Sequence, residues 1–244
     1  MLFRSDPEGN VIAELPGEGW EIAWSPDSTR VAVWVRFGET IGVYGLDGER
    51  QALLTMSRGW RPSGDHDPIW LPDGESLLVQ DDVVVPVDGS APYNLPLDRR
   101  RAREVTYSPD GSRVAYVANK SSLVVAEADG SNPQVVFRDW VVPVWSPNGD
   151  RIAFSSGSVS GRGVRNQIRV LDLATGTVTL LAEANGSDML EVVDFSPEGD
   201  RIHFSRLEGA IGPRSLWSVK ADGSDLRRLV AVTWGDWLSP GRTP

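Results

Sequence analysis

The sequence predicts an all-β repeat protein, and two observations support that prediction. A phrase made of an aromatic residue, Ser or Leu, Pro, and an acidic residue or Asn occurs five times, with successive copies 37 to 50 residues apart. Its copies begin at Trp24, Trp70, Tyr107, Trp145 and Phe195. Each copy is followed by β-rich runs and by an Asp-Gly or Thr-Gly pair, which is a hairpin signal. A period of about 40–45 residues with four strand-like segments predicts a β-propeller with one blade per repeat.

The first hairpin of each repeat is built around the repeated phrase. Proline presets φ at the second turn position, the acidic side chain bonds the nearby backbone, and a following glycine closes the turn. In four copies an arginine stands six positions after the aromatic residue and opens the second strand, at Arg30, Arg113, Arg151 and Arg201. We expect these arginines to pair locally or to cover the blade edge, and the repeated aromatic residues to pack between blades.

The later strands complete each blade, and the two ends of the chain complement each other. The expected blades are approximately 20–55, 66–97, 103–137, 141–182 and 190–230. Residues 1–15 resemble two outer strands, and residues 231–244 begin with an inner-strand pattern. Joined around a ring, they make a sixth blade and protect two sheet edges from aggregation. The sequence therefore predicts a single domain over residues 1–244, an all-β six-bladed β-propeller whose last blade is closed by N- and C-terminal strands.

Composition excludes several classes of function. The net charge of −10 disfavours a nucleic-acid partner, which normally meets a basic face. No apolar run approaches the length of a membrane-spanning helix. Cysteine is absent, which excludes disulfides and thiolate metal sites and leaves the compartment open. We expect a monomer that is cytoplasmic if Met1 is the natural start, and periplasmic or extracellular if a leader has been removed.

The repeated phrase resembles a known family. Aromatic-Ser-Pro-Asp-Gly, then arginine, then a run such as Ile152-Ala153-Phe154 and an Asp-Gly hairpin, is similar to the repeat of TolB-like β-propellers. The resemblance recurs five times and covers nearly the whole chain. It implies a propeller of six blades and a role as a bacterial protein-binding hub.

Propeller geometry sorts the loops into two faces. The Ser-Pro-Asp-Gly and Asp-Gly turns lie on one face of the propeller, which we call the turn face. The loops of the middle hairpins and the crossings between blades lie on the opposite face, which we call the variable-loop face. These variable loops are residues 55–66, 97–103, 155–167, 182–190 and 205–214. Variable loops on a rigid frame are where function concentrates.

The variable loops carry arginines and aromatic residues, which protein interfaces favour. We expect a partner-binding rim there, the alternative being solvated loops that aid solubility. Its residues are Arg58, Trp60, Arg61, His66, Arg99, Arg100, Arg101, Arg103, Arg162 and Arg165.

The channel is a second candidate site, because inner strands line the axis of a propeller. Its possible carboxylates are Glu21, Asp67, Glu104, Asp194 and Asp236. Clustered oxygens suit Ca²⁺, whereas a water-filled channel needs no ion. A third arrangement is a sugar-stacking platform made by Trp20, Trp60, Trp140 and Trp234.

Catalytic motifs are absent from the sequence: there is no Gly-x-Ser-x-Gly nucleophile elbow, no zinc-binding His-Glu-x-x-His motif and no phosphate-binding loop. The expected function is a non-catalytic scaffold that binds a protein through its variable loops, without a cofactor. The alternative is a channel ligand-binding protein, or a divalent-cation-assisted enzyme acting on a sugar or lactone.

Overall fold

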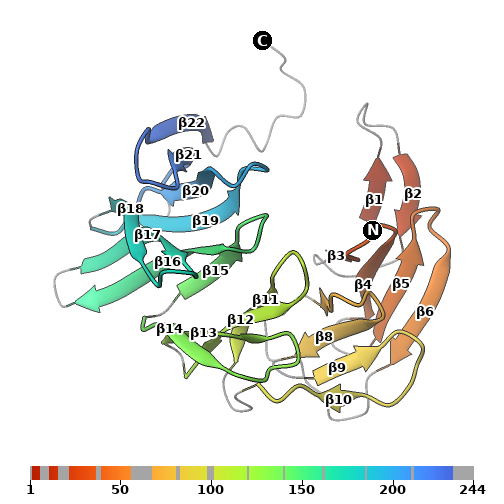
Figure 1. Ribbon diagram of the computed structural model, residues 1–244. Coiled ribbons are helices and arrows are strands. Elements are labelled where there is room, and N and C mark those ends of the chain that lie inside the picture. The colour runs from red at the N-terminus through yellow and green to blue at the C-terminus, as the bar shows by residue number, and fades with distance from the viewer. Residues whose placement is uncertain are drawn as a thin grey trace. The chain divides into compact units, whose positions relative to one another are not determined.

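The computed structural model describes residues 2–5, 11–15, 22–36, 40–55, 68–80, 83–97, 102–119, 121–139, 141–160, 163–184, 186–209 and 212–232 (Figure 1). Within these ranges every regular element is a β-strand. A helix long and apolar enough to cross a bilayer does not occur in them.

Five antiparallel sheets of four strands each follow one another along the chain. Blade one contains β3 (Ile22–Trp24), β4 (Arg30–Arg36), β5 (Thr40–Gly45) and β6 (Arg50–Thr55). Blade two contains β7 (Ile69–Trp70), β8 (Ser76–Gln80), β9 (Val83–Pro86) and β10 (Tyr93–Asn94). Blade three contains β11 (Arg103–Tyr107), β12 (Arg113–Ala118), β13 (Ser122–Glu127) and β14 (Gln134–Phe137). Blade four contains β15 (Val141–Trp145), β16 (Arg151–Ser160), β17 (Gly163–Asp172) and β18 (Val178–Ala184). Blade five contains β19 (Met189–Phe195), β20 (Arg201–Leu207), β21 (Arg214–Lys220) and β22 (Arg227–Val232). The five predicted four-stranded blades are confirmed.

The N-terminal strands form an antiparallel hairpin. β1 (Leu2–Ser5) pairs with β2 (Val11–Leu15), and Leu2 lies opposite Leu15. At the other end β22 runs to Val232, with Ala231 opposite Ser215, so residues 231 and 232 belong to blade five. The expected closing strand beyond them, residues 233–244, lies outside the described residues, and the six-blade closure stays a prediction.

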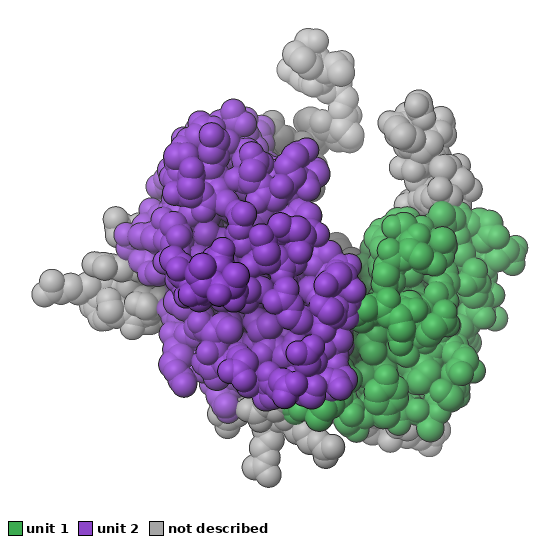
Figure 2. All heavy atoms as spheres, viewed as in Figure 1, with its two compact units in different colours: residues 1–99 green, residues 100–244 purple. Residues whose placement is uncertain are grey.

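The chain divides into two compact units, residues 1–99 and residues 100–244, shown in green and purple in Figure 2. The first unit holds blades one and two, and the second holds blades three to five.

Within each unit, adjacent blades bury an apolar layer between them. Trp34 and Ile41 of blade one pack with Trp70 and Leu77 of blade two. In the second unit, equivalent layers join blade three to blade four and blade four to blade five. Packing on both sides explains why second strands are continuously apolar rather than alternating. In β4, for example, the run Val31–Trp34 is at most 3% exposed throughout.

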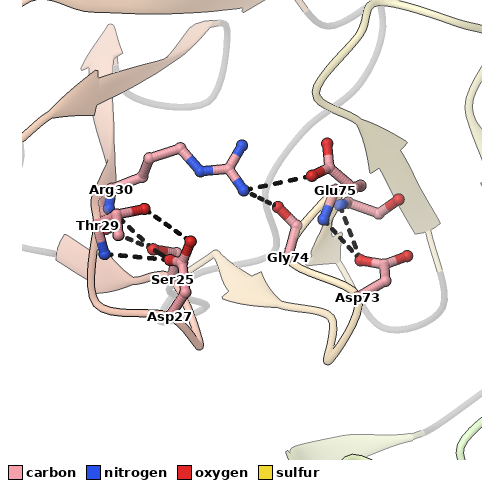
Figure 3. Close-up of polar contacts among 8 residues, drawn as sticks. Ser25, Asp27, Thr29, Arg30, Asp73, Gly74 and Glu75 are labelled. Carbon is pink, nitrogen blue, oxygen red and sulfur yellow. Dashed lines mark hydrogen bonds and ion pairs between the residues drawn. The ribbon is translucent and has the colours of Figure 1, made fainter.

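Side-chain hydrogen bonds within the repeat turn stabilise its conformation, as the turn of blade one shows (Figure 3). The Ser25 Oγ donates to the Asp27 carboxylate at 2.6 Å, and the Thr29 amide and hydroxyl donate to the same carboxylate. The Arg30 amide in turn donates to the Ser25 Oγ at 2.9 Å. Ser28 has a φ of 58°, a left-handed conformation where the other copies use glycine, such as Gly74 at 67°. The expected turn role of the repeated acidic residues is confirmed here.

The repeat arginine of blade one crosses to blade two (Figure 3). The Arg30 Nη2 donates to the carbonyl of Gly74 at 2.5 Å and lies 3.6 Å from the Glu75 carboxylate. The guanidinium also lies 5.0 Å from the centre of the Trp70 ring. The Trp70 Nε1 donates in the opposite direction, to the Ala23 carbonyl at 3.0 Å. We call this reciprocal pair of contacts the clasp.

Blades three and four repeat the clasp. Arg113 donates to the Gly149 carbonyl and lies 5.3 Å from the centre of the Trp145 ring, whose Nε1 donates to the Thr106 carbonyl at 3.2 Å. The expectation of local pairing is therefore wrong for Arg30 and Arg113, because a turn carbonyl and an indole ring of the next blade lie within reach.

Local pairing is confirmed for the other two repeat arginines. Arg151 lies 3.6 Å from Asp150, and Arg201 binds the Asp225 carboxylate at 2.7 Å within its own blade.

The repeated aromatic residues differ in burial. Trp70, Trp145 and Phe195 are 5–6% exposed, which confirms their packing between blades. Trp24 is 50% exposed. The repeat aromatic residues Trp70 and Trp145 bond the preceding blade, and for Trp24 that blade would include residues 233–244, which lie outside the described residues, so its packing stays a prediction.

Candidate functional site

Most of the predicted rim and channel residues lie outside the described residues. These are Arg58, Trp60, Arg61, His66, Arg99, Arg100, Arg101 and Arg162 of the rim, and Glu21, Asp67 and Asp236 of the channel. The tryptophans of the expected sugar platform, Trp20, Trp60, Trp140 and Trp234, also lie outside them. Their roles stay predictions.

Four predicted residues have described positions. Arg103 begins β11 opposite Val117, and Arg165 lies in β17 opposite Ser158. Glu104 is exposed and has a φ of 52°, at an irregularity in the pairing of β11 with β12. The exposed Asp194 accepts a hydrogen bond from the Phe195 amide at 2.7 Å. No group of three or more Asp, Glu or His that could hold a metal ion occurs in the described part of the chain.

A pocket that the sequence did not predict lies at the variable-loop ends of blades four and five. Its volume is about 110 Å³. The lining residues are Val142, Ser155, Ser156, Asn166, Met189, Leu190, Glu191, Ser205, Leu207 and Arg214. Strand pairing brings them together, since Val142 lies opposite Ser155, Glu191 opposite Ser205, and Leu207 opposite both Met189 and Arg214. We call this the seam pocket.

Burial orders the seam pocket from its base to its mouth. Ser155, Ser156, Asn166 and Ser205 are 3–9% exposed, so four polar residues belong to the buried part of the lining. Leu190 is 6% exposed, and Val142 and Leu207 are half-buried, which supplies apolar walls. Met189 is 54% exposed and marks the mouth together with the exposed Glu191 and Arg214.

Small residues at one repeat position leave room for this pocket. The fourth position after the repeat arginine holds Trp34 in blade one and Val117 in blade three, both buried in apolar layers. The same position holds Ser155 in blade four and Ser205 in blade five. A serine fills much less space than tryptophan or valine, so blades four and five leave room where blades one and three have core.

Asp188, in the crossing from blade four to blade five, fixes the surroundings of the pocket. Its carboxylate accepts two hydrogen bonds from the Arg206 guanidinium, at 2.8 and 3.1 Å, and one from the Gly209 amide at 2.9 Å. These hydrogen bonds, with that from Arg206 the strongest, hold the pKa of Asp188 below its usual value. The Asp188 carbonyl accepts from the Asn166 Nδ2 at 2.8 Å. One residue thus ties together β17, β20 and the loop that follows β20.

The charges at the mouth of the seam pocket cancel. The Arg214 Nη1 lies 3.4 Å from the Glu191 carboxylate and 3.4 Å from the Ser205 hydroxyl. Both charged side chains are more than half exposed, so their attraction is screened by water. The pocket therefore combines polar lining residues with one charge of each sign at its mouth.

The sequence contained a weak signal for this site. Ser155-Ser156 and Ser205 interrupt second strands that are apolar in other repeats, and the sequence predicts variable loops at 155–167, 182–190 and 205–214. The loop prediction is wrong for most of 155–167, because β16 continues to Ser160 and pairs with β17 from Gly163 onward. The sequence does not show the strand register, which places Asn166 opposite Gly157 and Glu191 opposite Ser205.

The chain has relatives among characterised and uncharacterised bacterial proteins. It is 34% identical over 251 aligned positions to the Tol-Pal system protein TolB of Anaeromyxobacter dehalogenans, covering 94% of this chain and 51% of that protein. It is 26% identical over 195 residues to an uncharacterized protein of Agrobacterium fabrum, covering 70% and 60% of the two chains. The chain thus spans about half the length of the curated relatives that it matches. No family model matches it.

Solved structures share the fold. A putative TolB from Agrobacterium tumefaciens superposes with a TM-score of 0.61 at 17% identity, covering 87% of this chain and 80% of that one. An oligogalacturonate lyase in complex with manganese superposes with a TM-score of 0.65 at 15% identity, covering 86% and 64%. At such identities the likeness shows the fold alone, an all-β propeller.

Proposed function

Since this chain is a TolB-like β-propeller, we propose that it is a non-catalytic scaffold that binds a protein through its variable-loop face. The seam pocket is the observation that carries the proposal, because it is a concave site between strands of blades four and five, next to the crossing that Asp188 holds in place. Its volume of about 110 Å³ is well below the roughly 300–1,000 Å³ typical of small-molecule sites. It suits a single side chain of a partner.

The surroundings of the seam pocket support a protein partner. Met189 and Val193 of β19 are 54% and 53% exposed, which is apolar surface near a polar recess. Interfaces commonly combine a pocket that receives an anchoring side chain with a rim that excludes water. The relative from Anaeromyxobacter is named for the Tol-Pal system, which is consistent with an assembly role for this chain.

Capture of partners by the immobilised protein tests the proposal. Met189→Arg places a charge at the mouth of the seam pocket, and we expect it to reduce the amount of captured partner about tenfold or more. Leu226→Arg is the matched control, because Leu226 is 49% exposed on the same blade but does not line the pocket. Capture should persist in this control. Equal capture by the wild type and Met189→Arg would contradict the proposal.

Binding of divalent cations distinguishes the alternative function. Tight stoichiometric binding of Ca²⁺ or Mn²⁺ in calorimetry, lost in Asp67→Ala, is the result expected of a channel enzyme or ligand-binding protein. The scaffold proposed here predicts no such binding.

A further inference from the structure

We propose that the end of the middle hairpin of blade four is a strand-addition site for an acidic, extended segment of the partner protein. This inference rests on the proposed function, because it names the chemistry of the partner and the way in which the partner binds. It follows from the pairing of β16 with β17, from the edge that this pairing leaves free and from the charge of the segment.

β16 and β17 extend beyond the strands on either side of them (Figure 1). Their pairing with each other continues to Ser160 opposite Gly163. β15 pairs with β16 only as far as Ser156, and β18 pairs with β17 only as far as Asn166. The two-stranded extension that results is called the blade-four ribbon, and it consists of residues 157–160 and 163–165.

Blade five lacks such an extension. The last pair of its middle hairpin is Leu207 opposite Arg214. Leu207 also has a partner in β19, and Arg214 also has a partner in β22. In blade four, by contrast, none of the described strands pairs with Gly157–Ser160 on the side away from β17. The backbone N–H and C=O groups along such an edge can pair with a further strand.

The ribbon lacks two common protections of a free edge. Over its described pairs the register continues without a bulge, and its sequence contains no proline. Bulges and prolines are devices that prevent an edge from pairing with another chain. A two-stranded ribbon is also only marginally stable by itself in water, so a third strand stabilises it.

The charge of the segment selects the partner. Between Asp150 and Asp172 the sequence has four arginines and no acidic residue, although the whole chain has a net charge of −10. Two of these arginines, Arg162 and Arg165, lie between residues 157 and 166 in the sequence. Opposite charges on neighbouring strands stabilise their pairing and like charges destabilise it. A second copy of the ribbon is therefore disfavoured, whereas an extended segment rich in Asp and Glu is favoured.

The root of the ribbon adjoins the seam pocket. Ser156 and Asn166 line the pocket, and Gly157 lies opposite Asn166. The Asn166 Nδ2 donates to the Asp188 carbonyl at 2.8 Å, which ties the root to the crossing between blades four and five. A partner segment on the β16 edge, which begins directly after Ser156, therefore lies next to the concave site of the proposed function.

Titration of the purified protein with two blocked seven-residue peptides, followed through its amide resonances, tests this inference. The first peptide alternates Val and Glu, and the second has Lys in place of each Glu. We expect the glutamate peptide to bind about tenfold more tightly than the lysine peptide. It should also slow the hydrogen exchange of amides within residues 157–160. The preference should shrink as salt is added, because salt screens exposed charges.

Two variants and a matched control locate the binding site. In the ribbon deletion, an Asn-Gly turn replaces residues 158–165 and joins Gly157 to Asn166 as a two-residue hairpin turn. This variant should keep the cooperative unfolding of the wild type and lose the binding of the glutamate peptide. Arg165→Glu should reduce the preference to about threefold or less. Arg228→Glu makes the same change of charge at an exposed position of β22 and should leave the preference unchanged.

Three outcomes would overturn the strand-addition site: equal affinity for the two peptides, an unchanged glutamate preference in the ribbon deletion, or slowed exchange only at amides outside residues 157–160. The peptides replace the partner protein, so failure of this inference can be told apart from failure of the scaffold function. A glutamate preference that depends on the ribbon, without any captured partner, would retain the site and reject the scaffold. Capture that depends on Met189 and persists in the ribbon deletion would retain the scaffold and reject this inference.

Discussion

Asp188 shows how much of the pocket's geometry depends on a single side chain. Its carboxylate holds Arg206 of β20 and the Gly209 amide, and its carbonyl holds the amide of Asn166. These partners lie 18 to 22 residues away along the chain. The local sequence Gly-Ser-Asp indicates a loop, but nothing in it shows that the carboxylate binds an arginine and an amide. Sequence reasoning can find such a loop and cannot find its partners.

We expect Asp188→Asn to destabilise the protein and to disturb the seam pocket. An asparagine amide is uncharged and has one acceptor oxygen, so it cannot accept from both Arg206 and the Gly209 amide, and the free energy of unfolding should fall by about 1–2 kcal/mol. Urea denaturation followed by circular dichroism measures the change. Glu191→Gln is the control, because its Arg214 partner is 3.4 Å away and exposed, and should cost less than about 0.5 kcal/mol. Equal effects of the two substitutions would contradict the role assigned to Asp188.

The Ser-Pro-Asp turn is the element that sequence predicts best. Proline, the acidic side chain and glycine act within six residues, so their hydrogen bonds follow from local geometry alone. Ser108 and Asp110 accordingly repeat the contact of Ser25 with Asp27, also at 2.6 Å. In the fifth copy the Ser196 hydroxyl instead donates to Asp200, because residue 198 is a glutamate with a longer side chain.

These turns give the stability of the protein a pH dependence. Hydrogen bonds, chiefly from the serine hydroxyl two residues earlier, lower the pKa of Asp27 and Asp110 to about 2 from an ordinary value of 3.8. A carboxyl whose pKa is lower in the folded chain stabilises the fold above its unfolded pKa and loses that contribution as the pH falls through the folded pKa. We therefore expect Tm to fall between about pH 4 and pH 2, and to fall less steeply in the Asp27→Asn/Asp110→Asn double variant.

Thermal melts at pH 5, 4, 3 and 2 measure these slopes. Glu198→Gln removes a carboxylate from the same turn position, where the serine hydroxyl bonds Asp200 instead, and its slope should match that of the wild type. Parallel plots of Tm against pH for the double variant and the wild type would show that the two turns do not contribute to the pH dependence of stability.

At the scale of the whole molecule, the clasp adds polar contacts to the apolar layers at two of the described junctions between blades. It links blade one to blade two and blade three to blade four, each time through an arginine, a turn carbonyl and an indole. The repeat sequence placed these residues in register and predicted five sheets. It could not show that the arginine reaches the next sheet, because that depends on how blades stack. The joining of the terminal strands into a sixth blade remains a prediction, because residues 233–244 lie outside the described residues.

Trp70→Phe tests the clasp. Phenylalanine fills most of the same space but cannot donate to the Ala23 carbonyl and holds the Arg30 guanidinium less well, so the free energy of unfolding should fall by about 1–2 kcal/mol. Tyr93→Phe serves as control, because this tyrosine of blade two is 46% exposed, and should cost less than about 0.5 kcal/mol. Urea titrations of both variants provide the comparison. A larger loss in Tyr93→Phe would refute the assigned role of the clasp.

Arg201 is a repeat arginine that does not reach the next blade. Its guanidinium bonds the Ser218 hydroxyl, and both the carboxylate and the carbonyl of Asp225, all within blade five. A repeat that can satisfy its own cation does not need a following copy to do so. A repeat of this kind can end an array without leaving its cation unpaired, whereas the repeats of Arg30 and Arg113 need the blade that follows them.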